Sequence, residues 1–313
     1  MSNPDVVVLG EPLIEISTVD PIAPRTRATL DVSGDVINVA AAAVAAGARV
    51  AAIARVSDDE LGTAVCTRLA ELGVNTDHVR RVPGFQGIYV QHADPSGERQ
   101  FCYARAGSAG STLCSDDLPD GLLESAGAVV ASGITGALSV SARDALIAAA
   151  TRAARFVYDP NFRPRLTTAA QARELLRALA PHSALITPSA PGEITTLLDA
   201  ENPQSAADAV LALGTTAVAV TCGSAGVHVQ DASGSRWQPA IPAPAVVDQT
   251  GAGDVFVGTL SARLALGDSL FDAAQLAAGA SSLAVGGAGG SGGIRPLEQV
   301  REHIATHAAE FTR

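Results

Sequence analysis

Short apolar runs separated by helical patterns extend over most of the chain. Apolar residues gather in six runs that end in polar or turn residues, and these predict buried strands at 6–10, 50–56, 128–132, 156–159, 184–187 and 217–221. Between them apolar residues recur at helical spacing, most clearly at 36–46 and 61–72, and Gly73 closes the second helix. Alternating strands and helices form parallel sheets covered on both faces. The pattern therefore predicts a doubly wound α/β fold with a mainly parallel sheet.

Two segments depart from this alternation of strands and helices. Residues 15–33 and 87–106 alternate in a β manner, the second around the turn Asp94-Pro95-Ser96-Gly97. We predict that they are antiparallel strands inserted into the α/β body as a small β lid. The lid has two open roles, cover for a substrate or a dimer surface. Residues 285–293 hold six glycines in nine positions, which predicts a flexible loop rather than more helix.

Length and composition favour one globular unit. The chain has 313 residues, of which 47% are hydrophobic and 17% charged, so it can bury a large core. One large α/β domain spanning 1–313, with the lid as an accessory element, accounts for this length. The net charge of −11 excludes partners that need a basic footprint, such as nucleic acids and anionic membranes. Small molecules and copies of the chain are the expected partners.

Several other chemistries are also excluded. All 21 basic residues are arginine, so a Walker A lysine and a Schiff-base lysine are both absent. The four cysteines are far apart and form no C-x-x-C pair, so neither a zinc cage nor a disulfide framework is expected. The beginning of the chain lacks the features of a secretion signal, and the apolar stretch 36–53 contains Asn38, Gly47 and Arg49. These features predict a cytoplasmic protein with free thiols and no membrane segment.

The segment Asp248-Gln249-Thr250-Gly251-Ala252-Gly253-Asp254 carries the clearest chemistry. Its glycines let successive amides point into one concavity, and the apolar positions that follow recur at helical spacing. The concavity then lies at a helix N-terminus, which attracts phosphate charge. Asp254 has two readings, a helix cap or the carboxylate that accepts a proton from a hydroxyl during phosphoryl transfer.

The run VVDQTGAGDVFVGTL closely resembles the C-terminal signature of the ribokinase-like (PfkB-type) carbohydrate kinases. The resemblance implies a ribokinase-like fold, Asp254 as catalytic base and Gly251, Ala252 and Gly253 as the anion hole. It covers nearly the whole chain, and it implies the cofactors ATP and Mg²⁺.

Two further motifs resemble the family. SGDVINVA resembles its Gly-Gly-x-x-x-Asn motif, with serine in place of the first glycine, and implies that Gly34 and Asn38 approach the sugar hydroxyls. Asn38 as a helix cap is the alternative. VTCGSAG resembles the family's nucleotide-binding turn and implies that Thr221, Gly223 and Gly226 face the phosphates or ribose, together with Gly251 and Gly253. An ordinary turn is the alternative there.

Within the family, four segments are most like the 2-keto-3-deoxygluconate kinases, namely GEPLIEIS, GIYVQHADPSGERQFCYARAGSAGS, SGITGALS and DPNFRPRL. A sugar acid brings a carboxylate, which guanidinium groups bind in a two-pronged manner. Arg105 and Arg163 are the candidates, with Arg165 as a neighbouring substitute. Tyr89 and Tyr103 occupy like-facing lid positions and are candidates to contact the sugar. The alternatives are a surface salt bridge for Arg105 and apolar packing for the tyrosines.

The metal site departs from the family pattern. Where the family has Asn-x-x-Glu, this chain reads Pro188-Ser189-Ala190-Pro191-Gly192-Glu193. Glu193 is therefore a weak magnesium candidate, the full ligand set is unknown, and Asp159 or water are open contributors. The asparagine that the family often places against adenine is also missing around 278–279.

Two other functions remain in view. A fructokinase or ribokinase would use the same reaction without a substrate carboxylate, and a non-catalytic sugar sensor would use only the fold. A dinucleotide-dependent dehydrogenase needs Gly-x-Gly-x-x-Gly after the first strand, where this chain reads Gly10-Glu11-Pro12-Leu13. Pairing of two lids across a two-fold axis would protect their edges, so a homo-oligomer is expected.

Overall fold

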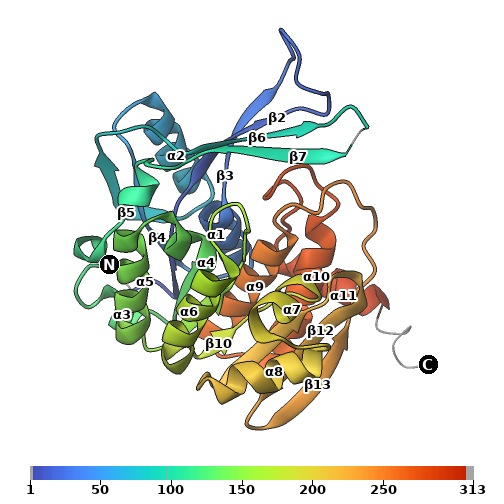
Figure 1. The fold of residues 1–313 in the computed structure, drawn as a ribbon. Coiled ribbons are helices and arrows are strands. Elements are labelled where there is room, and N and C mark those ends of the chain that lie inside the picture. Colours follow the sequence, from blue (N-terminus) through green and yellow to red (C-terminus); the bar gives the residue numbers. More distant parts are fainter. Residues whose placement is uncertain (1–2, 97, 308–313) are drawn as a thin grey trace.

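The computed structural model describes residues 3–96 and 98–307, which build a nine-stranded central sheet (Figure 1). Across the sheet the strands are β13 (Gly234–Pro239), β12 (Gly226–Asp231), β11 (Ala217–Thr221), β10 (Leu185–Ile186), β9 (Phe156–Asp159), β8 (Ala128–Ser132), β1 (Val6–Leu9), β4 (Val50–Ser57) and β5 (Asn75–Val82). Those from β11 to β5 pair in parallel, and β12 and β13 are antiparallel. The predicted mainly parallel sheet is confirmed.

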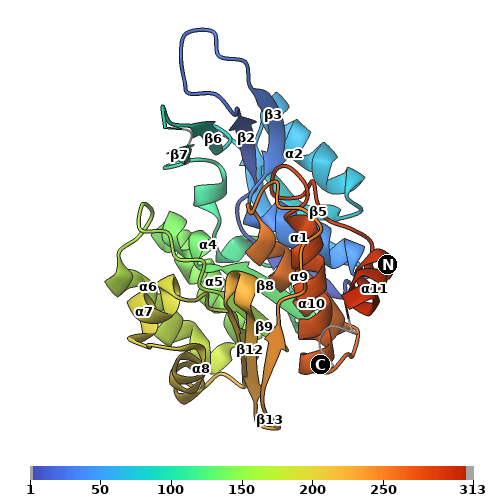
Figure 2. The same cartoon turned by 90° about the vertical axis from the view of Figure 1, so that its right-hand side faces the viewer.

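Helices cover both faces of this sheet, as Figure 2 shows from the side. One face carries α1 (Asp35–Ala45), α2 (Glu60–Glu71), α9 (Ala252–Ala265) and α10 (Leu270–Ala284), with α11 (Leu297–His307) outside α10. The other carries α3 (Leu122–Ser125), α4 (Gly133–Leu138), α5 (Val140–Arg152), α6 (Ala169–Leu179), α7 (Gly192–Leu198) and α8 (Pro203–Ala212). Along β1, Val6 and Val8 enter one apolar core while Val7 and Leu9 enter the other. A strand buried on both faces is apolar at every position, and this explains its unbroken run of apolar residues.

Local signals set where the helices begin and end. Asp59 caps α2 by accepting hydrogen bonds from the amides of Leu61 and Gly62, each 3.0 Å long. Gly73 follows that helix with a φ of +81°, which confirms the predicted glycine stop. Helix α10 ends at Ala284 and 285–293 is non-helical, also as predicted.

A second sheet of four strands stands over one edge of the first (Figures 1 and 2). Its order is β3 (Thr29–Ser33), β2 (Leu13–Ser17), β6 (Ile88–Ala93) and β7 (Arg99–Ala104). The hairpins β2–β3 and β6–β7 are antiparallel as predicted, but β2 and β6 pair in parallel. The two predicted antiparallel hairpins are thus confirmed, and a parallel β2–β6 pair joins them into one sheet. Strands β1 and β5 are parallel and end at the same sheet edge, so β2 and β6 leave the body in the same direction. Gly97, in the predicted turn, lies outside the described residues.

The strand order places a crevice beneath this lid. Strand β1 lies between β8 and β4. The chain runs from β1 to β4 and β5 on one side, and then crosses to β8 on the other side of β1, so the strand order reverses at β1. In open α/β sheets ligands bind at such a point, beyond the carboxyl ends of the strands. No helix within 3–96 and 98–307 is both long and apolar enough to cross a membrane.

Candidate active site

A cavity of about 470 Å³ occupies this crevice between the main sheet and the lid. Its lining comes from strand ends, from the beginnings of two helices and from the lid. These residues include Gly34, Asp35, Asn38, Tyr89, Phe101, Tyr103, Arg105, Asp159, Asn161, Arg163, Thr187, Glu193, Thr221, Thr250, Gly251, Gly253 and Asp254. Most of the predicted site residues, although far apart in sequence, therefore meet in one place.

Asp254 lies in the first turn of α9, and its carboxylate is fixed by two amides. The Asn38 side-chain nitrogen donates to one oxygen at 2.8 Å, and the Asn161 nitrogen lies 3.5 Å from the other. Burial and the nearby Asp35 raise the pKa of Asp254 to about 6, against the lowering effect of Asn38. The carboxylate is therefore oriented toward the cavity and has the proton affinity of a general base working near neutral pH.

The backbone before α9 forms the predicted concavity. Gly251 is the N-cap residue with a φ of +77°, and a side-chain carbon there would lie 2.5 Å from the carbonyl oxygen of Gly290. The first backbone hydrogen bond into the helix runs from the Val255 amide to the Gly251 carbonyl at 2.8 Å. The amides of Gly253 and Asp254 precede that bond and point out of the helix end. This arrangement can bind an anion.

Asp35 and Asn161 belong to the site, although sequence reasoning missed both. Asp35 begins α1 between the two predicted residues of the SGDVIN motif, and Ser132 at the end of β8 donates a hydrogen bond to its carboxylate. Asn161 lies within DPNFRPRL with a φ of +40°, a conformation that asparagine tolerates better than most residues. Both residues lie inside motifs that had already been singled out, and this position could have marked them as site candidates.

Aromatic rings of the lid face the cavity. Tyr89 and Tyr103 are directly paired across β6 and β7, which confirms their predicted like-facing positions, and their ring centres are 6.1 Å apart. Phe101 stacks on Tyr103 at 6.4 Å. The Tyr89 hydroxyl donates to Glu15, lies 3.0 Å from the Ser33 hydroxyl, and has its pKa raised by burial. Tyr89 is thus held inside the lid, whereas Tyr103 is 40% exposed.

The three candidate arginines differ in burial and in the groups that their guanidinium groups contact. Arg105 is buried and its guanidinium contacts Glu11, with 2.8 Å between Nε and the Glu11 oxygen Oε2. The alternative of a salt bridge thus holds for Arg105, but the pair is buried rather than on the surface. Arg163 is exposed, and its guanidinium donates to the Phe162 carbonyl at 3.3 Å. Arg165 donates to the Phe101 carbonyl of the lid. Arg105 and Arg163 both line the large cavity, and of these two Arg163 is the exposed one.

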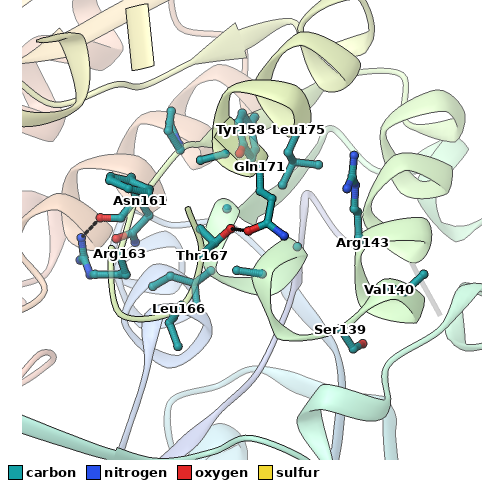
Figure 3. A pocket seen from close by; sticks show the side chains of 17 residues that line it. Ser139, Val140, Arg143, Tyr158, Asn161, Arg163, Leu166, Thr167, Gln171 and Leu175 are labelled. Carbon is teal, nitrogen blue, oxygen red and sulfur yellow. Dashed lines mark hydrogen bonds between the residues drawn. The ribbon is translucent and has the colours of Figure 1, made fainter. Parts of the chain in front are cut away.

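A second cavity of about 240 Å³ adjoins the first between α4, α5, α6 and the loop after β9 (Figure 3). Asn161 and Arg163 stand at one end of it, and Ser139, Val140 and Arg143 at the other. Asn161 and Arg163 line both cavities, so Arg163 lies at the border between them.

The predicted nucleotide turn is only partly at the site. Thr221 lines the large cavity, but Gly223 and Gly226 are not among its lining residues. Gly223 is exposed, with open space beside it. Gly226 is buried with a φ of +127°, and a side-chain carbon there would lie 2.2 Å from the Gln238 carbonyl oxygen. Close approach of β12 to β13, rather than a ligand, accounts for this glycine.

The carboxylates near the cavity do not form a metal cage. Both oxygens of Glu193 accept backbone amides, from Phe162 at 2.5 Å and from Ser189 at 2.8 Å. Burial, together with Glu193 and Asp254, raises the pKa of Asp159 well above its ordinary value. In the described part of the chain no group of three histidines, cysteines or acidic residues lies close enough to hold a metal ion.

Comparison with known proteins identifies the family to which the chain belongs. Residues 3–296 match the model of the pfkB family carbohydrate kinases. A 2-dehydro-3-deoxygluconokinase of Thermoproteus tenax is 37% identical over 287 residues, which cover 90% of this chain and 88% of that protein. A 2-dehydro-3-deoxygalactonokinase of Haloferax volcanii is 30% identical over 290 residues, 90% of each chain.

Among solved structures, a candidate Ribokinase II of E. coli in complex with ATP and Mg²⁺ superimposes with a TM-score of 0.87 at 25% identity. The match covers 97% of this chain and 99% of that one. The ribokinase-like fold predicted from the sequence is confirmed.

Proposed function

Because the chain belongs to the pfkB family of carbohydrate kinases, we propose that it transfers the γ-phosphate of ATP to a hydroxyl of a 2-keto-3-deoxy sugar acid. The proposed substrates are 2-keto-3-deoxygluconate and its epimer 2-keto-3-deoxygalactonate. Relatives named as kinases of each compound occur among the similar proteins. The observation that carries the proposal is the fixed carboxylate of Asp254 beside the free amides at the start of α9, in a cavity bordered by Arg163.

In the proposed reaction Asp254 accepts the proton of the sugar hydroxyl. The hydroxyl oxygen bonds to the γ-phosphorus while the bond to the β-phosphate oxygen breaks, ADP leaves, and Asp254 later returns its proton to solvent. The amides of Gly253 and Asp254 stabilise the negative charge on the transferring group, whereas the amide of Ala252, also predicted for the anion hole, donates to the Gln249 carbonyl at 3.3 Å. The rings of Phe101 and Tyr103 cover the sugar and exclude water, which would otherwise compete as acceptor.

Magnesium enters this proposal with the nucleotide. ATP is normally bound as its magnesium salt, and Mg²⁺ typically keeps several waters and phosphate oxygens as ligands. This preference agrees with a site where each Glu193 oxygen already accepts one backbone amide. We therefore propose ATP and Mg²⁺ as cofactors, with no dedicated cage of protein ligands.

We expect Arg163→Met to raise KM for 2-keto-3-deoxygluconate about 10- to 100-fold with a smaller change in kcat. A hydrogen bond to a charged group contributes about 1.5–3 kcal/mol, and ~1.4 kcal/mol corresponds to a factor of ten. Steady-state assays of ADP release provide the measurement. Arg105→Ala is a poorer probe because it would leave Glu11 buried without its cation.

Arg165→Met is the matched control, since it removes a neighbouring guanidinium that bonds to a lid carbonyl. A large KM increase for that variant alone would assign the carboxylate to Arg165 instead. The same assay on the wild type, with both keto acids, fructose, ribose and gluconate, tests the proposed function. Turnover of fructose or ribose but of neither acid would replace it with a neutral-sugar kinase, and no turnover at all would favour a sensor.

We also propose that the lid mediates self-association. Strands β3 and β7 are its edges, and the exposed apolar side chains Val19, Ile22 and Leu30 lie on or beside the β2–β3 hairpin, with Val19 90% exposed. Apolar edges of this kind are normally covered. Light scattering should report a dimer or larger assembly that Leu30→Glu dissociates. A wild-type monomer at micromolar concentration would rule the proposal out.

A further inference from the structure

Asp248 joins three segments around the reaction centre. On the lid strand β7, Arg99 donates through Nη1 to the Asp248 carboxylate and, at 3.1 Å, to the Thr250 hydroxyl. The Thr250 amide donates to the same carboxylate oxygen at 2.8 Å. The Gly289 amide, in the glycine-rich loop after α10, donates to the other oxygen at 3.1 Å. One carboxylate thus holds the lid, the segment that leads into the anion hole, and the glycine-rich loop.

The burial of Asp248 makes this junction more than a surface ion pair. The Asp248 side chain is 6% exposed, whereas that of Arg99 is 39% exposed. Burial alone would raise the pKa of Asp248, but the donors Thr250, Arg99 and Gly289 together hold it below its ordinary value. Arg99 is the only cation in that set. Without it the carboxylate would be nearly buried with backbone and hydroxyl donors but no opposite charge, a costly arrangement.

A short series of contacts leads from this junction to the catalytic carboxylate. Gly290 follows Gly289 and packs so closely on Gly251 and Asn38 that a side-chain carbon at 290 would lie 2.4 Å from the Asn38 nitrogen. That nitrogen donates to Asp254 at 2.8 Å. The position of the glycine-rich loop therefore bears on both the anion hole and the base.

We propose that Arg99 is a positioning residue, whose ion pair with Asp248 couples closure of the lid to assembly of the anion hole. Bound sugar then tightens the binding of ATP. This inference rests on the proposed function, since it assumes that the large cavity binds a sugar beneath the lid and a phosphate at the start of α9.

The coupling follows from where the parts lie. The sugar would contact Tyr103 on β7, the strand that carries Arg99, so it favours the state in which that strand lies against the body. With β7 against the body, the guanidinium reaches Asp248, which also accepts the amides of Thr250 and Gly289. A ligand shifts a conformational equilibrium by its difference in affinity for the two states, and the resulting coupling is reciprocal. ATP should therefore tighten sugar binding by the same factor.

Isothermal titration of AMP-PNP with Mg²⁺, with and without saturating 2-keto-3-deoxygluconate, measures the coupling as a ratio of Kd values. For the wild type we expect a ratio within the usual range of about 5–150. Arg99→Gln should bring the ratio to about 1–2, chiefly by weakening the binding of AMP-PNP in the presence of the sugar. Arg99→Lys keeps the charge but loses the fork, so it should recover part of the ratio.

Arg27→Gln is the matched control, because it removes the same charge from an exposed lid position that makes no ion pair within the described residues. It should keep the wild-type ratio. A ratio near 1 in the wild type, or an unchanged ratio in Arg99→Gln, would overturn the proposal. Failure of the proposed function is a separate outcome, seen when the wild type phosphorylates neither keto acid. The titration then uses whichever sugar is phosphorylated, and the same ratios decide.

Discussion

Asp254→Asn should lower kcat by ~10²-fold or more, the scale on which a general base contributes. The introduced amide keeps the shape of the side chain and an oxygen for the Asn38 donor, but it cannot accept the substrate proton. The fold should survive, because the substitution removes a charge that burial already disfavours. The measurement is ADP release at saturating sugar acid and ATP, with thermal unfolding to verify that the variant is folded. A folded variant with wild-type kcat would leave Asp254 only its structural contacts with Asn38 and Asn161, since Gly251 rather than Asp254 is the N-cap residue of α9.

The pH profile supplies a second measurement of the same role. The base acts in its ionised form, and the pKa of Asp254 lies at about 6, above its ordinary value of 3.8. The ionised fraction is nearly complete above about pH 7 and falls about tenfold per unit below pH 6. We therefore expect kcat/KM to be level near neutral pH and to decline on acidification through pH 6. The residual activity of Asp254→Asn should lack this decline, and a wild-type rate that rises on acidification would contradict the assignment.

Gly251→Ala should reduce kcat by ~10²- to 10³-fold, comparable to the loss of one donor from an oxyanion hole. Alanine is strained at a φ of +77°, and its side-chain carbon would lie 2.5 Å from the Gly290 carbonyl oxygen, so the loop must shift. That shift moves the amides at the start of α9 and the neighbours of Asn38 together. Activity at saturating substrates and the unfolding temperature report the two consequences.

Gly267→Ala separates these consequences, because Gly267 follows the other end of α9 with a φ of +98° and open space around it. Its substitution should cost about 1–2 kcal/mol of stability for the strained backbone alone. Activity should stay close to the wild-type value. Equal losses of activity in the two variants would show that general destabilisation, rather than distortion of the anion hole, explains the effect of Gly251→Ala.

The body of the fold was predictable because local and tertiary signals agree. The predicted bounds of β8, β9 and β11 coincide with the observed strands, since a strand buried on both faces must be apolar throughout. The parallel pairing of β2 with β6 was not predictable from alternation, which is the same for either direction. It depends on the sheet edge from which each strand leaves, a property of the assembled body.

In the site, too, some features could be predicted from local sequence and others depend on the assembled fold. Asp254 and Asn38 stand in short motifs with fixed spacing, and the structure brings them within hydrogen-bonding distance. The partnership of Arg105 with Glu11 joins residues 94 positions apart, and nothing in either local sequence indicates it. An exposed guanidinium and a paired one look alike in sequence, so the predictions for Arg105 and Arg163 could be told apart only by their surroundings.

The parallel pair at the centre of the lid also constrains how the lid can form and be exchanged. Its two hairpins are separate insertions, and the Tyr89 hydroxyl that crosses between them meets Glu15 at a distance of 74 residues along the chain. Neither hairpin alone has the partner strand that completes its backbone hydrogen bonds, because that partner belongs to the other hairpin. The lid is thus assembled from two separate insertions rather than from one continuous segment that could be exchanged as a unit. Transplanting one hairpin from another kinase would bring new sugar contacts together with an unmatched β2–β6 seam.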